Sequence, residues 1–93
     1  MASPWRRRPL CTLVGDSADP GALREISGIG AFLETSARPP LGTRVELRHP
    51  EAGAISAAVS ATSADGVRLS FDPGIAAMAF ALTAIACDMS LPN

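Results

Sequence analysis

Turn-forming residues recur at short intervals along the chain and divide most of it into brief segments. Runs rich in Gly, Pro, Asp or Ser lie at residues 15–21, 28–30, 39–42 and 65–66, and such runs favour turns and loops. Between them apolar and polar residues alternate, which is typical of strands with one buried face and one solvated face. The pattern predicts six strands, at residues 10–14, 22–27, 31–35, 44–48, 54–62 and 67–71.

A chain of 93 residues has the size of one small domain with one core. Six short strands separated by turns favour an all-β architecture, either a barrel or a sandwich. Hydrophobic residues make up 47% of the chain but aromatic residues only 4%. The interior must therefore be built mainly from Ala, Val, Leu and Ile.

The last part of the chain changes from strand to helix periodicity. Asp72-Pro73-Gly74 ends the sheet pattern, and Asp followed by Pro suits a helix start. We expect a helix over residues 73–87 whose larger apolar side chains pack on the sheet. That face comprises Ile75, Met78, Ala79, Leu82, Ile85 and Ala86.

Phe80 falls on another side of this helix, with Ala84 and Cys87. An exposed apolar patch commonly marks a protein partner or a second copy of the chain. We therefore expect Phe80 to form a partner interface, either with another protein or with a second copy of the chain in a homodimer. The helix and every other apolar run fall short of the ~20 residues needed to span a membrane.

Charge is unevenly distributed. All eight basic residues are arginines, nine carboxylates give a net charge of −1, and Arg6, Arg7 and Arg8 are adjacent. We expect residues 1–9 to form a flexible arginine-rich arm, with the folded domain over residues 10–93. General binding of DNA or RNA is disfavoured because it requires a surplus of cations to neutralise phosphates. A solvated basic tail is the alternative for the arm.

The two cysteines, Cys11 and Cys87, have no metal-binding spacing. Two thiols in a reduced, cytoplasmic protein are the expected state, with a disulfide as the alternative. No secretory signal follows the arginines. His49 is the only histidine, and no nucleophile, paired acid and base, or metal-ligand pattern accompanies it. We expect neither an enzyme nor a metal site.

Three features together resemble the PilZ family. They are the arginine-rich arm, the run Glu25-Ile26-Ser27-Gly28-Ile29-Gly30, and a barrel pattern closed by a C-terminal helix. The family pattern is two arginines separated by three residues, then Asp or Asn, any residue, Ser, two of any kind, and Gly. The runs at 30–35 and 67–71 also resemble strands of the family. Here Glu25 replaces Asp or Asn, and the arginines are contiguous.

The resemblance implies a six-stranded antiparallel barrel and a receptor for cyclic di-GMP in bacterial second-messenger signalling. It assigns ligand binding to Arg6, Arg7, Arg8, Glu25, Ser27 and Gly30. A guanidinium can meet guanine N7 and O6 or a phosphate, and a carboxylate can accept from guanine N1 and N2. Ser27 would add a hydroxyl, and Gly30 would let the backbone approach.

Two functions stay open. In the first, the arm arginines close over cyclic di-GMP while Glu25 and Ser27 contact a guanine. In the second, a divergent PilZ-like adaptor binds a protein and no nucleotide. Trp5 either stacks on a ligand or anchors the arm. Arg24 and Arg68 either lean toward the pocket or pair with surface carboxylates.

Overall fold

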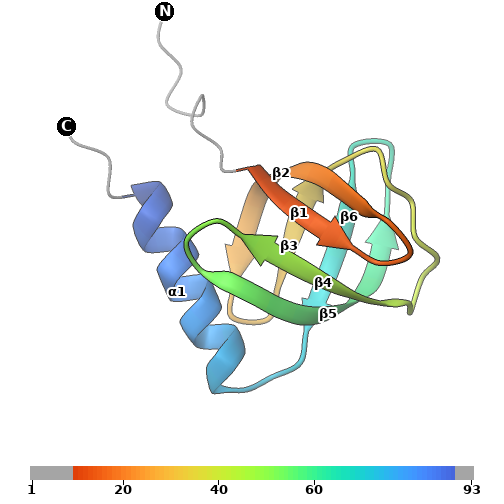
Figure 1. Ribbon diagram of the computed structural model, residues 1–93. Helices are drawn as coiled ribbons and strands as arrows, with labels where there is room; N and C mark the ends of the chain where they lie inside the picture. The colour runs from red at the N-terminus through yellow and green to blue at the C-terminus, as the bar shows by residue number, and fades with distance from the viewer. Residues whose placement is uncertain (1–9, 90–93) are drawn as a thin grey trace, which may run out of the picture.

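The computed structural model describes residues 10–89, with side chains to residue 86. Its elements are six strands followed by one helix (Figure 1). They are β1 (Leu10–Val14), β2 (Ala18–Ser27), β3 (Gly30–Glu34), β4 (Arg44–His49), β5 (Gly53–Thr62), β6 (Val67–Phe71) and α1 (Ile75–Met89). The arm residues Arg6, Arg7 and Arg8, with Trp5, lie outside the described residues.

The six strands close into one antiparallel barrel in the order β1-β2-β3-β6-β5-β4. Closure depends on β4, which pairs with β1 from Thr12 opposite Arg48 to Val14 opposite Glu46. The barrel with a C-terminal helix is therefore confirmed, and the sandwich alternative does not form. Within residues 10–89, no helix is long and apolar enough to cross a membrane.

The first turn is shorter than predicted, because β2 begins at Ala18 and includes Pro20 and Gly21. The first part of β2 pairs only with β1, and pairing with β3 begins at Ala22. The missing N–H of Pro20 therefore breaks no ladder bond to β3. The backbone oxygen of Pro20 instead accepts a hydrogen bond of 2.8 Å from the Thr35 hydroxyl.

The core is aliphatic, as the composition requires. Alternate residues of each strand point into the barrel, and Leu33, Leu47 and Val67 are completely shielded from solvent. The other large side chains that are fully buried are Leu69, Val59 and Cys11. Small residues and Leu or Val fill the barrel, and the aromatic residues Phe71 and Phe80 lie where the helix packs on it.

The predicted packing face of α1 is wrong. The larger side chains are exposed, with Ile75 at 86%, Met78 at 58% and Leu82 at 64% accessibility. The buried face instead carries Ala77, Phe80, Ala81 and Ala84. Alanines let the helix backbone approach the barrel closely, which larger side chains would prevent.

Phe80 is consequently not a surface interface, because only 3% of it is exposed. Its ring lies edge-on to Phe71 at 5.8 Å and to His49 at 6.1 Å between ring centroids. Such edge-to-face contacts suit aromatic rings in a packed core. Phe80 thus anchors α1 to the ends of β4 and β6. The helix as a whole lies against β2 and β5, beside the β4–β5 turn (Figure 1).

The helix also begins later than predicted, at Ile75 rather than residue 73. Its first hydrogen bond runs from the Met78 N–H to the Gly74 carbonyl at 3.2 Å. The Asp72 carboxylate does not cap it, since both oxygens accept hydrogen bonds from Arg44, at 3.1 and 2.5 Å. This contact ties the segment that leads to α1 to the start of β4.

Candidate ligand-binding site

A pocket of about 290 Å³ lies on the barrel where the β2–β3 hairpin meets β6. Glu25, Ser27 and Gly30, the described members of the predicted site, all line it. Its other lining residues are Ile26, Ile29, Ala31, Ser60, Arg68, Leu69 and Ser70. The spacing of the Glu25–Gly30 run therefore does bring these residues together.

A β-bulge in β2 turns Glu25 toward solvent. The β2–β3 register pairs Leu23 with Leu33 and then Glu25 with Phe32, so Arg24 is an extra residue. Strict alternation from the buried Leu23 would have pointed Glu25 into the core; the extra residue moves it to the outer face. Arg24 and Glu25 are both exposed, and Ile26 returns to the core side.

The hairpin between β2 and β3 fixes the position of Ser27. Ser27 pairs with Gly30 across the turn, and its Oγ accepts a hydrogen bond of 3.3 Å from the Ile29 N–H. Side-chain bonds of this kind stabilise tight turns. A Cβ at Gly30 would collide with the backbone oxygen of Leu69. The glycine is therefore required for close approach of β3 to β6, whether or not a ligand binds.

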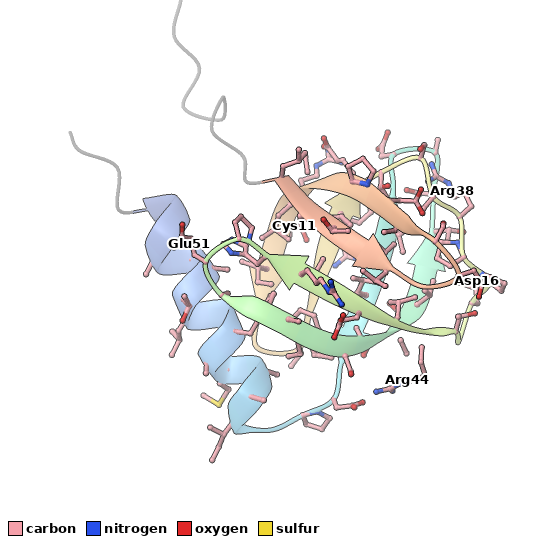
Figure 2. All side chains as sticks on the ribbon, viewed as in Figure 1. Cys11, Asp16, Arg38, Arg44 and Glu51 are labelled. Carbon is pink, nitrogen blue, oxygen red and sulfur yellow. The ribbon has the colours of Figure 1, made fainter. Side chains whose placement is uncertain are left out.

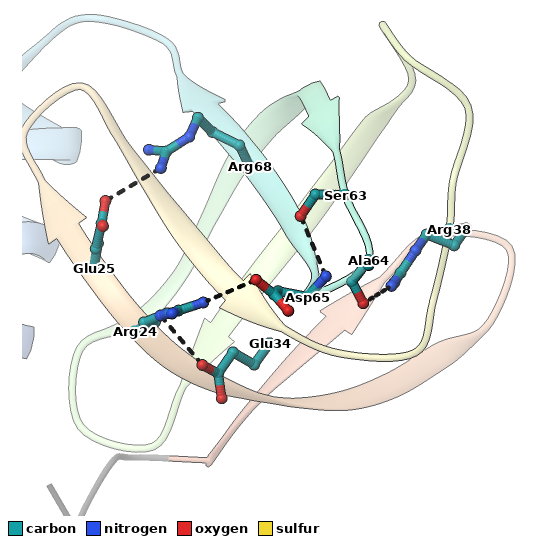
Figure 3. A network of polar contacts seen from close by, with 8 residues as sticks. All are labelled: Arg24, Glu25, Glu34, Arg38, Ser63, Ala64, Asp65 and Arg68. Atoms are coloured by element: carbon teal, nitrogen blue, oxygen red, sulfur yellow. Dashed lines mark hydrogen bonds and ion pairs between the residues drawn. The ribbon is translucent and has the colours of Figure 1, made fainter.

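The Glu25 carboxylate meets Arg68 across the pocket. Arg68 Nη2 lies 3.2 Å from Glu25 Oε1, and the two side chains are 49% and 61% exposed (Figure 3). This is a single contact between groups that both reach solvent, and such a pair contributes only about 0–1 kcal/mol. A ligand can therefore replace it with little loss.

The aromatic ring of Phe32 lies beside the Glu25–Arg68 pair. It lies opposite Glu25 on β2 and Arg68 on β6, on the outer face of the barrel. The guanidinium groups of Arg24 and Arg68 each lie 5.4 Å from its ring centroid. Cation–π contacts of this kind hold both arginines over the ring and shield it from water.

Arg24 is further restrained by two carboxylates. Its Nε lies 3.2 Å from Glu34 and its Nη1 lies 3.8 Å from Asp65 (Figure 3). Arg24 therefore belongs to a surface charge network away from the pocket lining. Of the two strand arginines considered from the sequence, Arg68 lines the pocket and Arg24 does not.

Every arginine between residues 10 and 86 has a partner within the chain. Besides Arg24 and Arg68, Arg38 donates hydrogen bonds to the backbone oxygens of Thr35, Ala37 and Ala64. Arg44 forms an ion pair with Asp72. Arg48 forms an ion pair with Glu46. The hydrogen bond from Arg44 lowers the pKa of Asp72, and Asp72 raises the pKa of Arg44. A phosphate that binds one of these guanidinium groups must share it with the partner described here or displace that partner.

A larger hollow of about 750 Å³ lies beside the β1–β2 turn and the segment before β4. It is lined by charges of both signs, among them Asp16, Arg38 and Arg44, on the side of the barrel away from α1 (Figure 2). The sequence signals at 15–17 and 39–42 predict loops and not a hollow between them. No resemblance or charge excess assigns a ligand to it.

The single histidine has a structural role. His49 is 4% exposed, and its Nδ1 accepts hydrogen bonds of 3.0 Å from the Glu51 and Ala52 N–H groups. It thereby holds the β4–β5 turn under α1. Among residues 10–86, no group of three or more acidic, His or Cys side chains is arranged to hold a metal ion.

A comparison with models of known protein families finds no match, and comparisons with curated proteins and with solved structures find none either. The PilZ resemblance therefore depends on the residues and the barrel pattern described above.

Proposed function

We propose that this barrel is a receptor domain for cyclic di-GMP. The observation that carries the proposal is that Glu25, Ser27 and Gly30 line one pocket together with Arg68. The pocket volume of about 290 Å³ is just below the ~300–1,000 Å³ of typical small-molecule sites. It suits one guanine edge, and the remainder of the dinucleotide needs contacts from outside the pocket.

Glu25 and Arg68 offer complementary chemistry for guanine. The carboxylate accepts hydrogen bonds from N1–H and N2–H, while a guanidinium donates to N7 and O6 or to a phosphate. On binding, guanine replaces Arg68 as the partner of Glu25, and Arg68 moves to a ligand acceptor. Ser27, Ser60 and Ser70 add hydroxyl groups to the pocket lining.

The β1–β2 register supports a contribution from the arm. Leu10 lies opposite Ala22, and the partners run in opposite directions along the two strands. Glu25 lies three residues after Ala22, so a chain that continued beside β2 would reach Glu25 about three residues before Leu10, near Arg7. At ~3.3 Å per residue this is a path of about 10 Å. Along such a path the arm arginines would reach the phosphates of a nucleotide bound above the pocket.

Calorimetric titration with cyclic di-GMP tests the proposal. Losing an arginine that is buried against a ligand phosphate costs ~2–5 kcal/mol, so an Arg7→Ala, Arg8→Ala double variant should bind at least about thirtyfold more weakly. Arg48→Ala is the matched control, because Arg48 lies on β4, outside the pocket lining, and its side chain pairs with Glu46. Equal affinities in the wild type and the double variant would remove the arm from the mechanism.

A second candidate is a PilZ-like adaptor that binds no nucleotide. The observation in its favour is that every arginine of residues 10–86 already has a partner, with Glu25 engaged by Arg68. Absence of any binding heat for the wild-type chain with cyclic di-GMP would favour the adaptor over the receptor.

A further inference from the structure

The outer side of α1 carries an apolar stripe with no cover in the described structure. Ile75, Met78 and Leu82 are strongly exposed and Ile85 is 38% exposed. The barrel occupies the other side of the helix, where Phe80 and its neighbouring alanines are buried. The stripe is therefore an outward surface, separate from the contacts that hold α1 on the barrel.

The stripe has the spacing of a helix-to-helix seam. Its members are separated by three, four and three residues, which is the a and d pattern of a heptad repeat. A strict a/d stripe matches a second helix packed nearly parallel or antiparallel to the first. The exposed residues beside these four include the small Ala76, Ala79 and Ala86, so the four large side chains project above their neighbours.

The chemistry of the helix favours a second copy of the same chain. Residues 75–86 contain no charged side chain, so α1 has there none of the flanking charges that select an unlike partner in coiled coils. A two-fold interface requires a surface that is complementary to itself. An uncharged apolar stripe meets this requirement in either helix orientation, and the barrels lie outside the seam.

The area available indicates the strength of association. A helix of 15 residues is about 22 Å long, and its stripe alone is smaller than the ~800 Å² per partner of a standard interface. Ile29 at the β2–β3 turn extends it, because Ile29 is 77% exposed and the adjoining Gly28 lies against Met78. The patch is therefore small for a stable interface, which predicts weak association.

We propose that the chain forms a two-fold dimer in which the Ile75, Met78, Leu82 and Ile85 stripe of α1 packs on the same stripe of a second copy. The modest area predicts a dimer that dissociates on dilution. The proposal does not depend on nucleotide binding.

Sedimentation velocity over a dilution series, without nucleotide, tests the proposed dimer. The wild type should change from dimer to monomer on dilution, and Leu82→Glu should be monomeric at every concentration. Thr83→Glu is the matched control, because Thr83 is exposed on the same helix but lies outside the stripe; it should dimerise like the wild type. Circular dichroism checks that both variants fold.

A wild type that stays monomeric at the highest concentration, or a Leu82→Glu variant that keeps the dimer mass, would overturn the proposal. So would a monomer that co-sediments with phosphatidylcholine vesicles and loses this with Leu82→Glu, since the stripe would then face lipid. Dimerisation without any response to cyclic di-GMP would leave this proposal standing and refute the proposed receptor.

Discussion

Replacing Phe80 by alanine should destabilise the domain severely. Phe80 is 3% exposed and has edge-to-face contacts with both Phe71 and His49. Truncation of a buried Phe to Ala costs about 3–5 kcal/mol, as lost transfer free energy and as a cavity. A chain of 93 residues has a total stability of roughly 5–14 kcal/mol. The loss is therefore a large fraction of the whole.

Urea unfolding followed by circular dichroism measures this loss. Circular dichroism reports on the strands and the helix directly, whereas the chain has one tryptophan, Trp5, and no tyrosine. Leu82→Ala is the matched control, because Leu82 is 64% exposed and such surface changes usually stay within about 0.5 kcal/mol. Dilute protein keeps association out of the comparison.

The two variants should differ by several kcal/mol in free energy of unfolding. If Phe80→Ala does not fold, Phe80→Leu, which retains part of the apolar volume, should still be clearly less stable than Leu82→Ala. Similar losses at the two positions, or a larger loss for Leu82→Ala, would refute the observed orientation of α1 and restore the face predicted from the sequence.

Three further changes follow from the contacts described. Gly30→Ala should lower the melting temperature, because its Cβ would meet the Leu69 carbonyl; an unchanged melting curve would contradict this close approach. His49→Ala should expose the β4–β5 turn to faster amide hydrogen exchange, because two N–H groups lose their acceptor. The pKa of Asp72 is lowered in the folded protein. The ionised carboxylate therefore stabilises the fold at pH values above its pKa in the unfolded chain, and this stabilisation is lost as the pH falls through its lower pKa in the folded protein. The stability difference between wild type and Asp72→Asn should therefore shrink in acid, and a constant difference would be evidence against the Arg44 contact.

The strands were predictable because their pattern is local. Alternation with period two fixes which residues face the core, and the Asp65-Gly66 pair correctly marks the hairpin between β5 and β6. Closure was not predictable from the residues alone, because it depends on pairing between β1 and β4, which are far apart in sequence. The resemblance, and not the pattern, favoured the barrel over the sandwich.

The packing face of α1 was predicted wrongly for a different reason. Hydrophobicity gives α1 two apolar sides, and choosing the side with the larger residues ignores how closely a helix can approach a curved sheet. Ala77, Ala81 and Ala84 permit that approach, and Phe80 fills the space that remains. Residue size, more than hydrophobicity, decides which side is buried here.

The candidate site was predictable in part. A short run of sequence places Glu25, Ser27 and Gly30 around one hairpin, so their proximity follows from chain continuity. The bulge that turns Glu25 outward and the approach of Arg68 depend on the pairing of β3 with its neighbours. Neither has a signal in the local sequence.

Chemical-shift mapping by NMR with cyclic di-GMP tests the central claim most directly. The proposed receptor predicts saturable shifts concentrated at residues 25–30 and at Arg68–Ser70, where the β2–β3 hairpin and β6 line the pocket. Shifts confined to the hollow at residues 15–17 and 37–44, or no shifts at saturating nucleotide, would contradict it.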